Sequence, residues 1–165
     1  RLFKASILEN VRAARPDATR EQVRAALMAA QCGDILEKLP QGMDTLIGSE
    51  GTYLSGGEQQ RIALARAILK DAPIVVLDEA TAFADPENEA LIQKAFSELT
   101  RGRTVIMIAH RLSTVVGVDK IYVVKDGQIA ESGSSRELLA QGGLFSRMWQ
   151  NYQTSVQWKV AKEVE

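Results

Sequence analysis

The sequence is short of cysteine, of net charge and of long hydrophobic runs, and each shortage excludes a class of protein. Its single cysteine, Cys32, excludes a disulfide framework within the chain and fits a reducing compartment. Twenty basic and 21 acidic side chains leave a net charge of −1, so no field of one sign points to nucleic acid as a partner. The apolar runs at 74–77 and 105–109 are far too short to cross a bilayer.

One short pattern is also missing. None of the 12 glycines is followed by lysine, so the phosphate-binding pattern G-x-x-x-x-G-K-[ST] does not occur within these 165 residues. What the chain does have is apolar content, 45% of its residues. A single domain of this length buries about 70% of the surface of its unfolded chain. Cys32, with Ala29, Ala30 and Ile35 nearby, is expected to be a small buried side chain of that core.

The first 72 residues are predicted to consist of helices and an irregular connection. Ser6 with Glu9, and Thr19 with Gln22, have the capping-box spacing that opens a helix. Residues 39–54 hold three glycines and a proline and are predicted to be an irregular connection. The segment EQQRIALARAILK, 58–70, then carries the apolar stripe of a helix that packs on a core.

The remainder alternates strands and helices. Residues 74–77 and 104–109 are mostly β-branched or apolar, which is typical of strands buried on both faces of a parallel sheet. A helix is predicted between them, and the later predicted elements are a short helix near 112–116, a hairpin with its turn at 125–127, and helices over 134–140 and 143–152. This order predicts an α/β sandwich with right-handed crossovers.

Two acidic residues follow the first predicted strand directly. Asp78 and Glu79 come after Leu77, at the carboxyl edge where open α/β sheets bind ligands. Successive strand residues point to opposite sides, so Asp78 could hold Mg²⁺ through water while Glu79 orients and deprotonates an attacking water. The structural alternative is that Glu79 caps the following turn and Asp78 pairs with a basic residue.

His110, the only histidine, ends the second strand at the same predicted edge. An imidazole there could donate to a phosphate oxygen or hold a water, although a lone histidine is more often structural. The run Ser55-Gly56-Gly57 precedes the 58–70 helix, where free N–H groups and the helix dipole form an anion site. A plain glycine-rich N-cap is the alternative explanation of that run.

Taken together, LSGGEQQR at 54–61, the strand with Asp-Glu at 74–79 and the histidine at 110 closely resemble the nucleotide-binding domain of ABC-type ATPases. The resemblance covers about residues 2 to 150. It implies a partial P-loop NTPase-like α/β sandwich with an α-helical signature subdomain. The implied parts are the signature subdomain over 1–72, the C-terminal part of the catalytic core over 73–152, and a tail over 153–165.

The resemblance also implies roles for particular residues, with ATP and Mg²⁺ as cofactors. The residues implied to contact the nucleotide are Ser55, Gly56, Gly57 and Glu58 of the signature and Asp85 of the D-loop. Asp78, at the end of the Walker B strand, is implied to bind the metal. Glu79 is the implied catalytic base, and His110 is the implied switch histidine. The D-loop departs from the usual Ser-Ala-Leu-Asp, because residues 82–85 read Ala-Phe-Ala-Asp.

The segments LFKASILENV and DTLIGSEG resemble the exporter-type subset, in which a coupling helix of a transmembrane domain rests on this region. The implied partners are therefore that transmembrane domain and a second nucleotide-binding domain, without nucleic acid, at the cytoplasmic face of a membrane. Because the Walker A motif is missing here, we expect the chain to be the C-terminal part of the ATP-binding domain and to be inactive alone.

Two other functions fit some of these residues. One is a soluble ABC ATPase of DNA repair or translation, against which the balanced charge and the coupling-loop-like front end count. The other is a non-enzymatic module that donates its signature loop to another ATPase. A sheet without a central strand would leave an open edge, which counts against that module.

Overall fold

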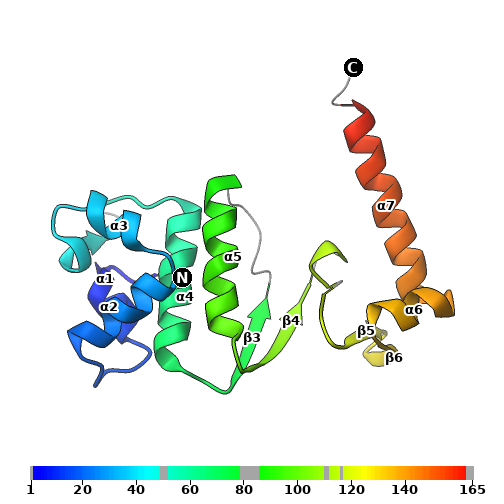
Figure 1. Ribbon diagram of the computed structural model, residues 1–165, viewed down its shortest axis with the longest axis horizontal. Helices are drawn as coiled ribbons and strands as arrows, with labels where there is room; N and C mark the ends of the chain where they lie inside the picture. The colour runs from blue at the N-terminus through cyan, green and yellow to red at the C-terminus, as the bar shows by residue number, and fades with distance from the viewer. Residues whose placement is uncertain (1, 49–51, 79–85, 110–111, 116, 163–165) are drawn as a thin grey trace. The chain divides into compact units, whose positions relative to one another are not determined.

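The computed structural model describes residues 2–48, 52–78, 86–109, 112–115 and 117–162 (Figure 1). The contacts of the chain divide it into two compact units, Arg1–Ile108 and Ala109–Glu165. Unit 1 combines the helical region with the first two predicted strands. The division by role at residue 72 stays a prediction. Within the described residues, no helix is both long and apolar enough to span a membrane.

Capping boxes start the helices α1 (Ile7–Arg12), α2 (Arg20–Ala29) and α4 (Gly56–Lys70) of unit 1. In each box the cap side chain accepts the N–H of the third helical residue, whose own side chain accepts the N–H of the cap residue. The helices predicted from Ser6 and Thr19 are therefore confirmed. The helix α3 (Gly33–Lys38) was not predicted, and its first residue follows a cap, Cys32, that makes no side-chain capping bond.

Helix α4 is the centre of unit 1, where it packs against α1, α2 and α5 (Pro86–Thr100). Its predicted stripe is buried at Ile62, Ala65 and Leu69. Cys32 is 0% exposed, as expected from its neighbours. The helix ends where Asp71 adopts a left-handed conformation with φ 53°.

Strands β3 (Ile74–Asp78) and β4 (Thr104–Ile108) pair in parallel, with α5 as the crossover between them. Val75, Leu77 and Val105 pack against the helical core. Burial of both faces is not found within this chain, where Val76 is 62% exposed on β3 and its register partner Ile106 is 53% exposed. The helices of unit 1 thus cover one face of this sheet.

A second, smaller sheet pairs the start of the chain with residues 46 and 47. Strand β1 (Ala5–Ser6) pairs antiparallel with β2 (Leu46–Ile47), which follows the 3-10 turn η1 (Gly42–Asp44). Both β2 and η1 lie in the region predicted to be irregular.

Unit 2 is built on the predicted hairpin. Strands β5 (Ile121–Lys125) and β6 (Gln128–Gly133) pair antiparallel through a turn in which Asp126 and Gly127 have φ of 51° and 76°. The other elements are η2 (Leu112–Val115), α6 (Ser135–Gln141) and α7 (Leu144–Lys162), around a core of Ile121, Val123, Leu138 and Phe145. Helix α7 extends beyond the predicted end at residue 152 and takes in most of the tail.

Candidate functional site

Residues 54–58 form the amino-terminal end of α4. Leu54 is 3% exposed and anchors this segment in the core, whereas Ser55 and Gly56 are exposed. Ser55 is extended, with φ −62° and ψ 162°, and its Oγ accepts the N–H of Glu58 at 3.3 Å. The N–H groups of the first helical turn have no acceptor within the helix. This end of α4 therefore has the donors and the dipole that bind an anion.

Not every amide of the Ser-Gly-Gly run is available, however. The expectation that all three N–H groups are free is wrong for Ser55, because its N–H donates to Glu58 Oε2 at 2.8 Å. That bond is the second half of the capping box. The exposed donors left for a ligand are the N–H group of Gly56 and the hydroxyl of Ser55, whereas Gly57 is buried against α5.

The side chain of Glu58 is bonded to other residues of this chain. Its residue is 8% exposed, Oε2 accepts from Ser55, and Oε1 forms an ion pair with Nζ of Lys38 on α3. Burial raises the pKa of Glu58, but the bonds from Lys38 and Ser55 outweigh it and leave the pKa lowered. Glu58 is therefore ionised at neutral pH, and the contact with ATP predicted for it stays a prediction.

Arg61 is a buried residue of the signature helix to which the sequence reasoning gave no role. It is 1% exposed, and its guanidinium donates to both oxygens of Asp34 at 2.6 and 2.9 Å and to Asn88 Oδ1 at 3.1 Å. It thereby joins α3, α4 and α5. The sequence does contain one indication that Arg61 is buried. Arg61 stands four positions before Ala65 and therefore lies on the same buried stripe of the helix.

Asp78 is exposed at the carboxyl end of β3, directly opposite Ile108 of β4. Glu79, Asp85 and His110 lie outside the described residues, so their predicted roles stay predictions. In the sequence, Glu79 follows Asp78 and His110 comes two residues after Ile108. The described part of the chain holds no cluster of three or more metal-binding side chains. A single exposed carboxylate does suit Mg²⁺, which takes one or two carboxylates together with phosphates and water.

The signature and Asp78 lie toward the same end of unit 1. The amino-terminal ends of α4 and α5 and the carboxyl ends of β3 and β4 are directed that way (Figure 1). This is the arrangement that open α/β folds use to gather ligand-binding groups. Among the described interactions, no hydrogen bond or ion pair joins Asp78 to the signature.

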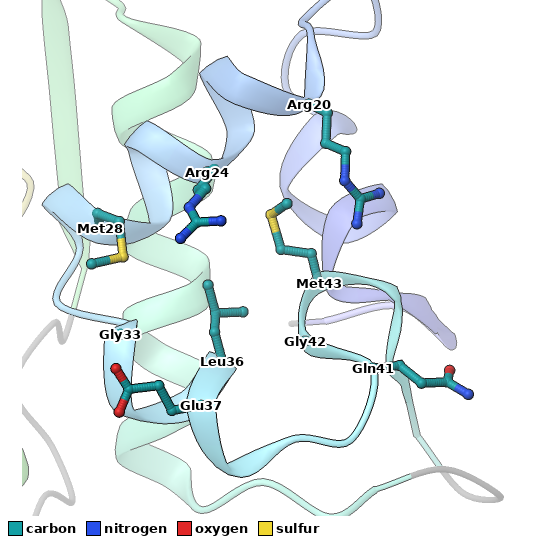
Figure 2. A pocket seen from close by; sticks show the side chains of 9 residues that line it. All are labelled: Arg20, Arg24, Met28, Gly33, Leu36, Glu37, Gln41, Gly42 and Met43. Atoms are coloured by element: carbon teal, nitrogen blue, oxygen red, sulfur yellow. The ribbon is translucent and has the colours of Figure 1, made fainter.

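Surface cavities also occur among the described residues of unit 1. One, of about 350 Å³, lies between α2, α3 and η1, where Arg24, Leu36 and Met43 are among its lining residues (Figure 2). It contains none of the predicted site residues. Another, of about 270 Å³, lies beside β1 and β2 and reaches the signature through Leu54 and Gln59.

Comparisons with known proteins agree with the resemblance. Residues 2–82 match the family model described as ABC transporter. The mycobactin import ATP-binding/permease protein IrtA of Mycolicibacterium thermoresistibile is 51% identical over 148 residues, which are 90% of this chain and 16% of that protein. The ATP-dependent lipid A-core flippase of Chromohalobacter salexigens is 49% identical over 149 residues, 90% of this chain and 26% of that protein.

A solved structure gives the same answer for the fold. It is that of a bacterial Atm1-family ABC exporter with ATP bound, which matches 91% of this chain and 26% of its own with a TM-score of 0.80 and 43% identity. These findings define the class of protein to which the chain belongs, which is an α/β protein of the P-loop NTPase type. The chain belongs to the ABC transporter family, as part of an exporter-type ATP-binding domain. It spans from 16% to 26% of the length of these relatives.

Proposed function

We propose that this chain is the signature-bearing, C-terminal part of the ATP-binding domain of an ABC transporter, which couples ATP binding and hydrolysis to the movement of a solute across a membrane. The observation that carries the proposal is the Ser55-Gly56-Gly57 run at the exposed amino-terminal end of α4. The matched ATP-binding/permease protein and lipid flippase support it.

In this proposal the signature completes a site on a second ATP-binding domain. The N–H group of Gly56 and the hydroxyl of Ser55 bind the γ-phosphate of an ATP held mainly by that partner. Glu58 and Asp85 lie next to this ligand, and the D-loop to which Asp85 belongs contacts the partner domain. Closure of the two domains around ATP then drives the transmembrane helices, and hydrolysis resets them.

The chemical step is assigned to the edge of the parallel sheet. Asp78 would hold Mg²⁺, which neutralises phosphate charge when it is bound. Glu79 would take a proton from the attacking water, and His110 would hold the γ-phosphate or that water. The pairing of β3 with β4 supports this assignment, since Glu79 and His110 follow neighbouring strand ends in the sequence.

The transmembrane partner is proposed to dock at the 270 Å³ cavity beside β1 and β2. Two aromatic side chains among its lining residues are exposed to solvent, Phe3 by 57% and Tyr53 by 88%. Because the same cavity reaches Leu54, a helix seated there would contact the signature directly. In this proposal the chain lies at the cytoplasmic face of a membrane, attached through the transporter's transmembrane segments.

The test is ATP hydrolysis by the intact protein carrying Glu79→Gln. Loss of a general base is expected to lower kcat by about 100-fold or more while ATP binding is retained. The matched control is Glu98→Gln, a carboxylate near the far end of α5 whose pair is Arg101. Undiminished turnover in Glu79→Gln would remove Glu79 as the base, and an intact protein that binds no ATP would overturn the function.

Transport is tested separately, with the intact protein reconstituted in liposomes. ATP-dependent accumulation of a fluorescent lipid or siderophore, abolished by Glu79→Gln, is the expected result. ATP hydrolysis with no dependence on a membrane or on transmembrane segments would instead indicate a soluble ABC ATPase.

A further inference from the structure

Lys38 and Ser55 are connected through a single carboxylate. The Oε1 atom of Glu58 forms an ion pair with Lys38 Nζ at the carboxyl end of α3, and its Oε2 accepts the backbone N–H of Ser55 at 2.8 Å. Ser55 Oγ in turn accepts the N–H of Glu58. The cation on α3 therefore acts, through Glu58, on the backbone of the residue that begins the signature helix.

The burial of Glu58 makes this connection necessary. The Glu58 side chain is only 11% exposed, whereas that of Lys38 is 49% exposed. A carboxylate taken out of water needs a countercharge or several hydrogen bonds. Lys38 is the one cation paired with Glu58 in the described part of the chain. Without Lys38, Glu58 would keep its charge only by moving toward water, and its bond to Ser55 would be weakened.

A second ion pair keeps α3 in place independently of Lys38. One turn along both helices, Asp34 of α3 accepts two hydrogen bonds from Arg61 of α4. Arg61 is also bonded to Asn88 of α5. The docking of α3 on α4 therefore has its own anchor. Removing the charge of Lys38 should leave this anchor intact and affect mainly the geometry at Ser55.

We propose that Lys38 is a positioning residue for the ATP site, which holds Glu58 so that Glu58 orients the backbone and hydroxyl of Ser55 toward the nucleotide. The inference rests on the proposed function, in which Ser55 binds the γ-phosphate. It assigns to the short helix α3 the task of holding the signature in its binding conformation.

The experiment compares ATPase kinetics of the intact protein with Lys38→Met, Lys38→Arg and Glu58→Gln, alone and in the Lys38→Met/Glu58→Gln pair. Lys38→Met should raise KM for ATP by about threefold to tenfold, with a smaller change in kcat, as expected when a charge-assisted contact behind a binding group is lost. Lys38→Arg should restore KM to within about twofold, because it keeps the charge.

The double variant tests the route through Glu58. A glutamine at position 58 can still accept from Ser55 without needing a countercharge, so Lys38→Met should change KM by less than about twofold in that background. Lys70→Met, an exposed lysine at the far end of α4, is the matched control and should leave KM unchanged.

Three results would overturn the proposal: an unchanged KM in Lys38→Met, an equal effect of Lys38→Met with and without Glu58→Gln, or no rescue by Lys38→Arg. Glu79→Gln, measured in the same series, separates a failure of the role of Lys38 from a failure of the proposed function. If it abolishes hydrolysis while Lys38→Met has no effect, the proposed function stands and only the role of Lys38 fails. If hydrolysis survives Glu79→Gln, the assignment of the base fails as well.

Discussion

Gly57 of α4 and Asn88 of α5 approach so closely that a Cβ atom at Gly57 would lie 2.8 Å from both Cβ and Cγ of Asn88. Carbon atoms in contact prefer separations of about 3.5–4.0 Å, so a side chain at position 57 would force the two helices apart. The second glycine of the signature is therefore required by helix packing. This requirement exists whether or not a phosphate approaches its N–H group.

Gly57→Ala is accordingly predicted to weaken the contact between α4 and α5. Overpacking of this kind costs about 1–3 kcal/mol, which native-state hydrogen exchange of the α4 and α5 amides in the intact protein would measure. Gly56→Ala is the matched control, since Gly56 is exposed and alanine favours helix. Equal protection in both variants would show that α5 gives way without cost.

The Asp34–Arg61 pair is predicted to make the docking of α3 sensitive to acid. Arg61 holds the pKa of Asp34 below its ordinary value of 3.8, and burial opposes this shift. A carboxyl with a lowered pKa in the folded chain stabilises it above the ordinary value and loses that contribution as pH falls through the lowered one. Protection of α3 amides should therefore be complete at neutral pH and decline below about pH 4.

Asp34→Asn should weaken α3 docking already at neutral pH. Loss of one partner of a buried pair costs about 3–5 kcal/mol, but the Asp34 side chain is 56% exposed, so we expect about 1–2 kcal/mol. The control is Asp44→Asn, which breaks the exposed Arg20–Asp44 pair and should cost less than Asp34→Asn, because solvent screens that pair. A larger loss in Asp44→Asn would contradict the ranking by burial.

The features predicted correctly from the sequence are those determined by neighbouring residues. The capping boxes at Ser6 and Thr19 and the hairpin turn at Asp126 and Gly127 depend on spacings of a few positions. Helix α3 was missed because its cap residue, Cys32, makes no side-chain bond that would mark a helix start. Its six residues also give too short a pattern for periodicity to be seen.

The differences from prediction concern contacts between residues far apart in the chain. The exposure of Val76 and Ile106 depends on what covers the second face of the sheet, which strand composition does not contain. In the same way, Ser55 and Gly56 could be assigned to the signature from the motif alone, but Glu58 meets Lys38 only because α3 packs beside α4. Motifs identify the residues of a site, and tertiary packing decides which of their atoms remain available.

Cys32 is predicted to be unreactive in the folded protein. Burial raises the pKa of its thiol to about 12, with a smaller opposing effect of the nearby Arg61 and a small raising effect of Asp34. At pH 8 the thiolate population would be lower than that of a free cysteine by roughly 1,000-fold, and access is blocked as well. Labelling by a thiol reagent should be very slow in the native protein and rapid in denaturant. Fast native labelling would contradict the burial of this residue.

Glu131 is predicted to hold the first turn of α7. Its carboxylate accepts the N–H of Leu144 and, at 3.0 Å, that of Phe145, and these bonds lower its pKa from the ordinary value of 4.5. Glu131→Gln offers one acceptor oxygen for two N–H groups, so exchange at the Leu144 and Phe145 amides should become faster. Because a carboxyl with a lowered pKa loses its contribution only in acid, the wild-type cap should persist down to about pH 4.5. Glu137→Gln, which alters the cap of α6, is the control and should leave the α7 amides unchanged. Unaltered exchange in Glu131→Gln would show that the packing of Phe145 holds this turn without the carboxylate.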